Sequence, residues 1–363
     1  MRVLVVNAGS SGLKLRLLDD ANEVLRTQDF KLCEAGIDHD ELAAAVGDWP
    51  RPDAVGHRIV HGGRRFTAAV RIDAEVERAL RDLIDLAPLH QPKSLAAYDA
   101  VIRLLPDVPA VASFDTAFHA TLPAAAATYA VPCAWRERYG VRRYGFHGLS
   151  HAYASRRAAE LLGRPLEALR LVTCHLGAGA SLAAVVQGRS VDTTMGFTPL
   201  EGLVMATRSG SIDPGLVLWL EEHAHMTSGE ISLALEQRSG LLGLAGTADM
   251  REIEARAAAG DAAAQLAFDV FVHRLVTGIG AMAAAAGGMD AVIFTGGIGE
   301  RSPRVRQAAV KRLAHWSARI DASANAQAQS DADISDKAVA VRTLVVTARE
   351  DIQIAHEARS RLR

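Results

Sequence analysis

Two stretches far apart in the chain share one plan. Residues 5–18 (VVNAGSSGLKLRLL) and residues 174–186 (CHLGAGASLAAVV) each consist of an apolar strand, a turn of small residues and a second strand. A hairpin of this plan near the start of each half predicts two related domains. A cleft between such domains would be lined by both turns.

The rest of the chain alternates between two kinds of segment. Short apolar runs rich in β-branched residues predict strands, and longer segments with apolar residues at helical spacing predict helices. The expected strands are 3–6, 13–18, 110–114, 171–175, 181–187, 291–295 and 342–347, and the expected helices are 75–87, 93–104, 150–162, 251–286 and 303–317. Such alternation predicts an α/β fold with mostly covered sheets. The polar, small-residue segment 322–333 is expected to be a solvated loop.

Composition narrows the class of partner. With 363 residues, of which 49% are hydrophobic, the chain is long enough for about two domains, each with its own core. A formal net charge of -2 without a basic stripe argues against a nucleic-acid partner and favours a small molecule. Three scattered cysteines argue against a disulfide framework, and the longest weakly polar stretch, 276–289, is too short to span a membrane. Since the first residues also lack a signal-peptide pattern, we expect a cytoplasmic protein.

Three turns of small residues follow predicted strands and are candidates for binding phosphate. Glycine-rich turns present backbone N–H groups with no Cβ in the way, which suits phosphate oxygens. Asn7 and Lys14 flank the first turn, 9–12, where they suit a hydrated metal ion and a phosphate oxygen. The third turn, in 292–303 (VIFTGGIGERSP), instead leads into a helix expected to begin near Pro303. For the first turn taken alone, an ordinary hairpin is the alternative.

Charged side chains interrupt or follow the predicted strands. Arg58 lies in the apolar run 55–66 (VGHRIVHGGRRF), either as a salt-bridged core residue or as a fork for an oxyanion. Asp115 directly follows a strand, at the strand end where α/β sites gather, unless it only caps a helix. Glu350 and Asp351 follow the last strand and are candidate ligands for Mg²⁺, unless they simply begin a helix.

Histidine and arginine in loop-rich stretches complete these candidates. His147 and His151 have the spacing of two metal ligands on a helix, but Gly148 lies between them and no third ligand is near in the sequence. We therefore expect His147 to hydrogen-bond a transferring phosphoryl group, with a buried structural histidine as the alternative. Arg208 lies among small residues in 199–215, as expected of an exposed, approachable guanidinium.

With these turns and the interleaved Arg, Asp and His residues, the chain resembles the acetate kinases, of the superfamily that includes sugar kinases, actin and heat-shock chaperone ATPases. The resemblance rests on NAGSSGLK, GHRIVHGG, LAPLHQP, FDTAFH, YGFHGLSH, CHLGAG, DTTMGFTPLEGLVMATRSGSIDP, GTADMREI and FTGGIGE, which follow one another over nearly the whole chain. It implies two duplicated ribonuclease H-like domains, with mixed sheets flanked by helices and the active site in the interdomain cleft. Residues 1–116 plus 353–363 would form an acetate-binding domain, and residues 117–352 a nucleotide-binding domain.

The resemblance also implies a reaction. Members of this family transfer the γ-phosphoryl group of ATP to acetate, giving acetyl phosphate and ADP, reversibly and with Mg²⁺, for which Mn²⁺ can substitute. It implies a homodimer as well. Because acetate is already an anionic nucleophile, the protein mainly has to align it with the γ-phosphorus and offset the negative charge.

The roles of individual residues are carried over by motif. Asn7 and Glu350 would hold the metal, and Lys14 would contact a nucleotide phosphate. The catalytic residues would be Asp115, His147, Arg208 and Arg58, with Asp115 acting either as a base or as a positioning group. Arg58 would also bind the substrate carboxylate, beside Val60, Leu89, His90, Phe146 and Pro199. The ATP-binding stretches would be His175, Leu176, Gly177, Ala178 and Gly179; Asp249, Met250 and Arg251; and Gly296, Gly297, Ile298, Gly299 and Glu300.

The sequence departs from the usual pattern at a few positions. Gly12 stands where relatives usually have serine, and Ala178, Arg301 and Arg349 stand where they usually have asparagine. A propionate or other short-chain carboxylate kinase is the nearest alternative, because one methylene changes discrimination by only roughly 1–3 kcal/mol. A sugar kinase and a non-enzymatic ATP switch of the actin type are further alternatives.

Overall fold

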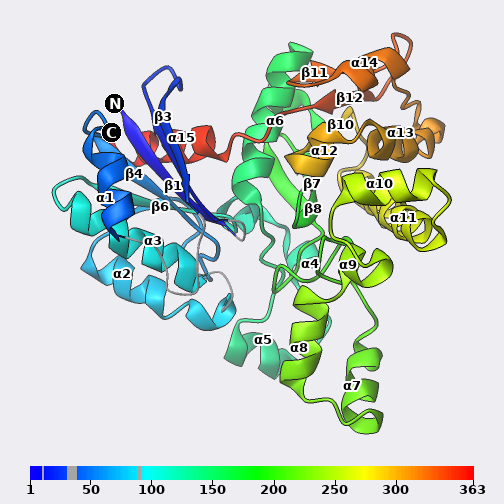
Figure 1. Ribbon diagram of the computed structural model, residues 1–363, viewed down its shortest axis with the longest axis horizontal. Coiled ribbons are helices and arrows are strands. Elements are labelled where there is room, and N and C mark those ends of the chain that lie inside the picture. The colour runs from blue at the N-terminus through cyan, green and yellow to red at the C-terminus, as the bar shows by residue number, and fades with distance from the viewer. Residues whose placement is uncertain (10–11, 31–38, 88–90) are drawn as a thin grey trace. The chain divides into compact units, whose positions relative to one another are not determined.

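The protein is described by a computed structural model, which covers residues 1–9, 12–30, 39–87 and 91–363. The chain divides into two compact units (Figure 1). Unit 1 comprises Met1–Ala120, Phe146–Tyr153 and Arg349–Arg363, and unit 2 comprises Thr121–Gly145 and Ala154–Ala348. Residues 117–120, 146–153 and 349–352, which the sequence placed with the second domain, group with unit 1. The roles of the two domains in binding acetate and nucleotide stay predictions.

Among the described residues, unit 1 is built on a six-stranded sheet in the order β3-β2-β1-β4-β6-β5. The central pairs β1–β4 and β4–β6 are parallel, and the outer pairs are antiparallel, so the sheet is mixed. Its strands are β1 (Val3–Gly9), β2 (Gly12–Leu18), β3 (Val24–Phe30), β4 (Ala54–Ile59), β5 (Val70–Arg71) and β6 (Ala110–Phe114). Its helices are α1 (His39–Gly47), α2 (Ala74–Arg81), α3 (Gln91–Leu104), α15 (Glu350–Leu362) and the first turns of α6 (Gly148–Leu162).

Successive side chains of a strand point to opposite faces, and in the central strands of this sheet the side chains on both faces are buried. On one face Leu4 and Val55 meet Val101 of α3. On the other face Val5 meets Ile354 of α15. The C-terminal helix therefore completes the core of the N-terminal unit.

Unit 2 repeats the sheet of unit 1. Its order, β9-β8-β7-β10-β12-β11, matches that of unit 1 strand for strand, with the same parallel and antiparallel pairs. This confirms the predicted duplication and places β10 where unit 1 has β4. The strands are β7 (Arg170–Leu176), β8 (Ala180–Val186), β9 (Arg189–Thr193), β10 (Ala291–Thr295), β11 (Ala332–Asp333) and β12 (Arg342–Val345). The helices, besides the rest of α6, are α4 (Ala124–Ala127), α5 (Cys133–Tyr139), α7 (Pro214–His223), α8 (Ser228–Gln237), α9 (Gly240–Ala245), α10 (Met250–Ala258), α11 (Ala262–Ala285), α12 (Gly296–Arg301), α13 (Pro303–Lys311) and α14 (Ala322–Gln327).

Three sequence predictions about unit 2 are wrong in part. The helix predicted over 251–286 is two helices, α10 and α11, separated at Gly260, whose φ of +91° ends the first. The segment 322–333 is not a loop throughout, because Asp321 caps α14 and β11 follows. The third small-residue turn is itself the helix α12, which begins at Gly296 ahead of α13.

One helix of the described chain, α11, is long and apolar enough to cross a membrane by length and composition. The sequence indicated 276–289 as the longest weakly polar stretch, and α11 shows that the apolar segment is longer. In the structure α11 packs against α10, α9 and β8, and 44% of its most apolar window is buried within the protein. A buried core helix of this composition passes the same test.

Candidate active site

A row of polar side chains crosses one face of the sheet in unit 1. The register pairs Lys14 of β2 with Asn7 of β1 on one side and with Asp29 of β3 on the other. Arg58 of β4 lies one residue beyond the last position paired with β1. Because residues paired across strands share a face, Asp29, Lys14, Asn7 and Arg58 lie side by side.

Arg58 is the centre of this row. Its Nε and Nη2 donate to the two carboxylate oxygens of Asp115, at 3.0 and 2.6 Å. Its Nη1 donates to Asn7 Oδ1 at 3.2 Å. Asn7 Nδ2 in turn donates to Glu350 Oε2 at 2.8 Å. The salt-bridged alternative for Arg58 is therefore observed, and four residues predicted for the site lie together in unit 1.

The charges of this cluster are strongly coupled. Burial lowers the pKa of the Arg58 guanidinium, but the carboxylates of Asp115 and Glu350 outweigh burial and hold that pKa above its usual value. Burial raises the pKa of Asp115, and Glu350 adds to the rise, whereas the paired Arg58 opposes it. One guanidinium beside two carboxylates leaves negative charge in excess when both are ionised, which suits a cation.

The start of α6 is fixed to the end of β6. His147, just before the helix, has a φ of +57°, and its backbone N–H donates to the Asp115 carboxylate. The Gly148 N–H donates to the Asp115 carbonyl at 2.9 Å, where a Cβ on Gly148 would come within 2.2 Å of that oxygen. His151 is buried with its ring against that of His119. Within the described residues, no three His, Cys, Asp or Glu side chains are arranged to hold a metal ion.

The residues predicted for the acyl pocket fall in different parts of the chain. Val60 and Phe146 are both buried in unit 1, where the Phe146 ring packs against His61 and its carbonyl contacts His119 Nε2 at 3.0 Å. Pro199 belongs to unit 2. The other two, Leu89 and His90, lie outside the described residues.

In unit 2 the second and third small-residue turns meet. The β7–β8 turn is closed by the Gly177 N–H, which donates to the Gly179 carbonyl at 2.9 Å. Gly296, with a φ of +77°, lies so near Leu176 that a Cβ would come within 2.9 Å of its backbone. Only glycine fits both the backbone conformation and this approach. The first turn belongs to unit 1, and its Ser10 and Ser11 lie outside the described residues.

The backbone of α12 is held by two side chains. Glu300 Oε1 accepts hydrogen bonds from the N–H groups of Gly296 and Ala348, both at 2.9 Å. Arg306 is fully buried and donates from Nη1 to the carbonyls of Gly299 and Glu300, at 2.8 and 2.6 Å. Arg306 was not singled out from the sequence. The local sign of its role is that this arginine falls on the apolar side of α13.

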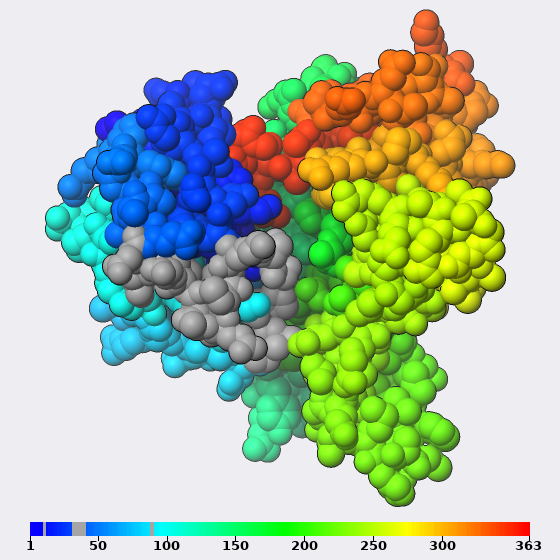
Figure 2. Space-filling model, viewed as in Figure 1, coloured from blue at the N-terminus to red at the C-terminus, as the bar shows by residue number. Residues whose placement is uncertain are grey.

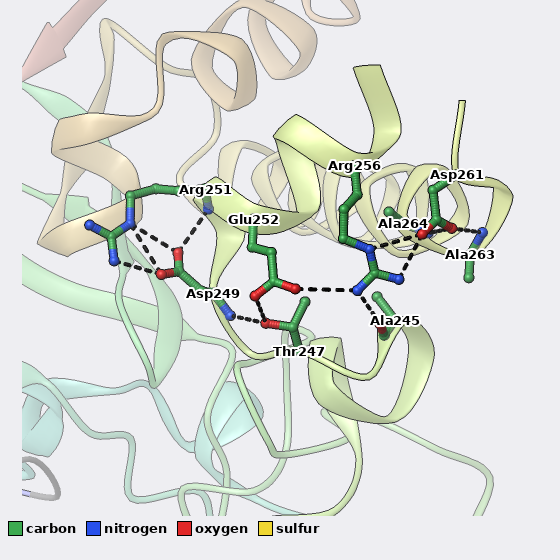
Figure 3. A network of polar contacts seen from close by, with 9 residues as sticks. All are labelled: Ala245, Thr247, Asp249, Arg251, Glu252, Arg256, Asp261, Ala263 and Ala264. Carbon is green, nitrogen blue, oxygen red and sulfur yellow. Dashed lines mark hydrogen bonds and ion pairs between the residues drawn. The ribbon is translucent and has the colours of Figure 1, made fainter. Parts of the chain in front are cut away.

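The predicted nucleotide stretch at 249–251 forms a surface network (Figure 3). Asp249 caps α10 and accepts from the Arg251 backbone at 2.9 Å, while the Arg251 guanidinium folds back onto the same carboxylate. Met250 is buried beneath them. Next to this pair, Arg256 binds Asp261, the cap of α11. The acid at position 249 therefore has a capping role.

Arg208 departs from expectation. The prediction that its guanidinium is exposed is wrong, because the Arg208 side chain is only 13% exposed. Nη1 donates to the Pro199 carbonyl at 3.0 Å, and Nε lies 3.5 Å from Glu236. Burial lowers the pKa of Arg208, and Glu236 opposes this. The guanidinium thus contacts the Pro199 carbonyl of its own loop and Glu236 of α8.

Comparison with known proteins identifies the family. The acetokinase family model matches residues 50–356. Acetate kinase from Carboxydothermus hydrogenoformans is 41% identical over an alignment of 390 residues, which covers 98% of each chain. The chain belongs to the acetokinase family.

Two solved structures from proteins with this fold resemble the chain equally well. Acetate kinase from Porphyromonas gingivalis has a TM-score of 0.91 at 35% identity and is covered over 100% of both chains. A propionate kinase from Francisella tularensis has the same TM-score and identity over 99% of both chains. Backbone similarity within the acetokinase family therefore does not separate the two acids.

Proposed function

We propose that this acetokinase-family protein is an acetate kinase, which transfers the γ-phosphoryl group of ATP directly and in line to acetate and reversibly forms acetyl phosphate and ADP. The observation that carries the proposal is the cluster of Asn7, Arg58, Asp115 and Glu350 on one face of the unit 1 sheet. It supplies a fixed guanidinium for a carboxylate and oxygen groups for a cation.

Arg58 would bind the acetate carboxylate, and Asp115 would orient Arg58. Acetate needs no general base, because it is ionised at neutral pH. Both Nε and Nη2 of Arg58 are bound to Asp115, which fixes the plane of the guanidinium. We therefore assign Asp115 the positioning role rather than that of a base. Val60 and Phe146, both buried in unit 1, would contact the methyl group.

Asn7 and Glu350 would hold Mg²⁺, or Mn²⁺ in its place. Their oxygens are hard ligands, and the excess of carboxylates around Arg58 favours a cation there. When bound, the metal offsets charge on the nucleotide phosphates. Lys14, exposed beside Asn7, would contact a phosphate, and His147 and Arg208 would stabilise the transferring group.

The nucleotide would bind to the small-residue stretches of unit 2. The meeting of the 175–179 and 296–300 stretches supports this proposal, because it gathers glycine N–H groups in one place. Residues 249–251 would contribute from the start of α10. A propionate kinase remains the second candidate, favoured by the propionate kinase structure of equal similarity.

Acyl phosphate formation tests the proposal. The protein would be assayed by hydroxamate capture with acetate, propionate and butyrate, each with ATP, GTP and pyrophosphate. We expect the highest kcat/KM with acetate and ATP and a requirement for a divalent cation. A higher kcat/KM for propionate establishes the second candidate. Glucose-stimulated release of ADP without any acyl hydroxamate establishes a sugar kinase and overturns the proposal.

Variants of Arg58 and Arg208 connect the activity to the site. Arg58→Ala and Arg208→Ala are each expected to slow transfer by orders of magnitude, whereas Arg78→Ala, on the surface of α2, is expected to leave it unchanged. Since Arg58→Ala leaves the buried Asp115 without its partner, thermal unfolding is measured in parallel. Wild-type rates in both variants contradict the proposed site.

We also propose that two copies of the chain associate through α7 and α8, which lie on the visible surface in Figure 2. Leu216, Leu218 and Trp219 of α7 and Leu233 of α8 are large apolar side chains that are exposed in the single chain. Light scattering during size exclusion is expected to give the mass of a dimer. Leu218→Asp is expected to give a monomer, and a wild-type monomer contradicts the proposal.

A further inference from the structure

A cluster of three side chains in unit 2 surrounds the loop that leads to Pro199. Glu201 accepts a hydrogen bond from the Tyr129 hydroxyl and another from Arg143 Nη2, the latter at 2.7 Å. The Arg143 guanidinium also lies 5.5 Å from the centre of the Tyr129 ring. With 17% of the Arg143 side chain and 35% of the Glu201 side chain exposed, this ion pair is partly shielded from water.

The same three side chains hold the backbone of the loop. The Phe197 N–H donates to the Tyr129 oxygen at 3.0 Å. Arg143 Nη1 donates to the carbonyls of Thr194 and Met195, both at 3.1 Å. The loop is thus anchored before Pro199 by these bonds, and after it by Glu201 itself.

Gly196 shows how closely the loop follows the cluster. A Cβ on Gly196 would lie 1.7 Å from Glu201 Oε2 and 2.1 Å from the Tyr129 hydroxyl. Any side chain there would occupy the place of the Tyr129–Glu201 hydrogen bond. Glycine is needed here for space, since its φ is not positive.

Arg208 depends on this loop. Its Nη1 donates to the Pro199 carbonyl at 3.0 Å, and Pro199 lies midway between the anchored residues 197 and 201. Nη1 also lies 3.7 Å from Met205 Sδ, and Nε lies 3.5 Å from Glu236. The Pro199 carbonyl is therefore one of the groups that orient the guanidinium, and the loop holds that carbonyl in place.

We propose that Tyr129, Arg143 and Glu201 are positioning residues that fix the 194–201 loop and, through the Pro199 carbonyl, aim the Arg208 guanidinium. This inference rests on the proposed function, in which Arg208 stabilises the transferring phosphoryl group. Removal of the Tyr129 hydroxyl frees Phe197 N–H and one oxygen of Glu201, so the loop loses the anchor nearest to Pro199, while the Arg143 bonds to Thr194 and Met195 remain. Burial raises the pKa of Tyr129, so the phenol remains a donor at neutral pH.

A double-mutant cycle tests the inference in the full-length protein. Tyr129→Phe and Arg208→Ala are made singly and together, with Glu201→Gln as a second change in the same cluster. Tyr139→Phe, which removes an exposed phenol hydroxyl on α5, is the matched control. For each variant, kcat, the KM for acetate and for ATP, and the melting temperature are measured.

We expect Tyr129→Phe and Glu201→Gln to lower kcat about 10- to 100-fold, with little change in either KM. Tyr139→Phe is expected to match the wild type. In the Arg208→Ala background, Tyr129→Phe is expected to have no further effect, because the side chain that the loop aims is gone.

The possible failures are distinguishable. If the wild type forms no acyl phosphate, the proposed function fails. If it does form acyl phosphate but Arg208→Ala has the wild-type rate, the proposed role of Arg208 fails and the positioning role with it. If Arg208→Ala is slow but Tyr129→Phe keeps the wild-type kcat, the positioning role is overturned. It is overturned also if Tyr129→Phe slows both backgrounds by the same factor, which indicates a purely structural effect.

Discussion

Arg306→Met would remove the guanidinium that ties α12 to α14. The Arg306 side chain is fully buried, and its Nε and Nη2 donate to the side-chain and backbone oxygens of Asn325, both at 2.7 Å. With the two bonds to Gly299 and Glu300, four acceptors depend on this one group. Burial lowers the pKa of Arg306 to about 10, so it remains charged at neutral pH.

The cost of the substitution follows from those acceptors. Methionine fills most of the volume but donates no hydrogen bond, so all four oxygens lose their partner. At about 1 kcal/mol for each buried acceptor, the low end of the usual range, the loss of unfolding free energy is about 4 kcal/mol. For a unit of this size, that corresponds to a melting temperature lower by roughly 8–16 °C.

Calorimetry and nucleotide kinetics measure the two consequences. The melting temperature of unit 2 is expected to fall by that amount, and the KM for ATP is expected to rise more than the KM for acetate, because Gly299 and Glu300 belong to a proposed nucleotide stretch. Arg274→Met, an exposed arginine on α11, is the matched control and is expected to change neither. An Arg306→Met protein that melts within about 2 °C of the wild type would refute the reasoning.

Burial lowers the pKa of His57 to about 3 from 6.5, and within the described chain neither ring nitrogen has a hydrogen-bond partner. The unfolded chain binds this proton at higher pH than the folded one, so the contribution of neutral His57 to the free energy of unfolding is complete above pH 6.5 and is lost as the pH falls toward 3. In urea titrations, His57→Leu should reduce the fall of that free energy by about 1.4 kcal/mol per pH unit. Equal slopes of free energy against pH in the two proteins contradict this. Gly12→Ser is expected to cost about 1–3 kcal/mol of stability, because Gly12 has a φ of +146°, and a lower KM for ATP at an unchanged melting temperature contradicts this. Asp115→Asn is expected to lower kcat about 100-fold at every pH, whereas loss of an acidic limb from the pH–rate profile would show Asp115 to be a base.

The central strands of both sheets were predictable, and the edge strands were not. The predicted runs at 3–6, 13–18, 110–114, 171–175 and 291–295 all became strands, because their sequences are mainly apolar and most of their side chains are buried, Lys14 being exposed. The missed strands β3, β5, β9 and β11 are the four outermost ones. An edge strand has a neighbouring strand on one side only. Like β3, with its sequence VLRTQDF, it carries polar side chains, so its sequence lacks the apolar run by which a strand is predicted.

The candidate site shows the same division. Arg58 and Asp115 could be singled out because a charge in or after an apolar strand is unusual. Tyr129 and Arg143 could not, because nothing near them in the sequence shows that they meet Glu201, which is 72 and 58 residues away. The available signal was Glu201 itself, within the long motif 192–214.

The sequence by itself determined the duplicated hairpins, the small-residue turns and the charged residues at strand ends, because these depend on neighbours along the chain. Only the tertiary structure decided which of them meet. Asn7 and Glu350 are 343 residues apart, yet they share a hydrogen bond because α15 closes the unit 1 sheet. Arg58 reaches Asp115 because β4 and β6 are parallel neighbours in a fixed register. Strand order and helix docking are set by the burial of apolar faces across the whole unit, and no local pattern encodes them.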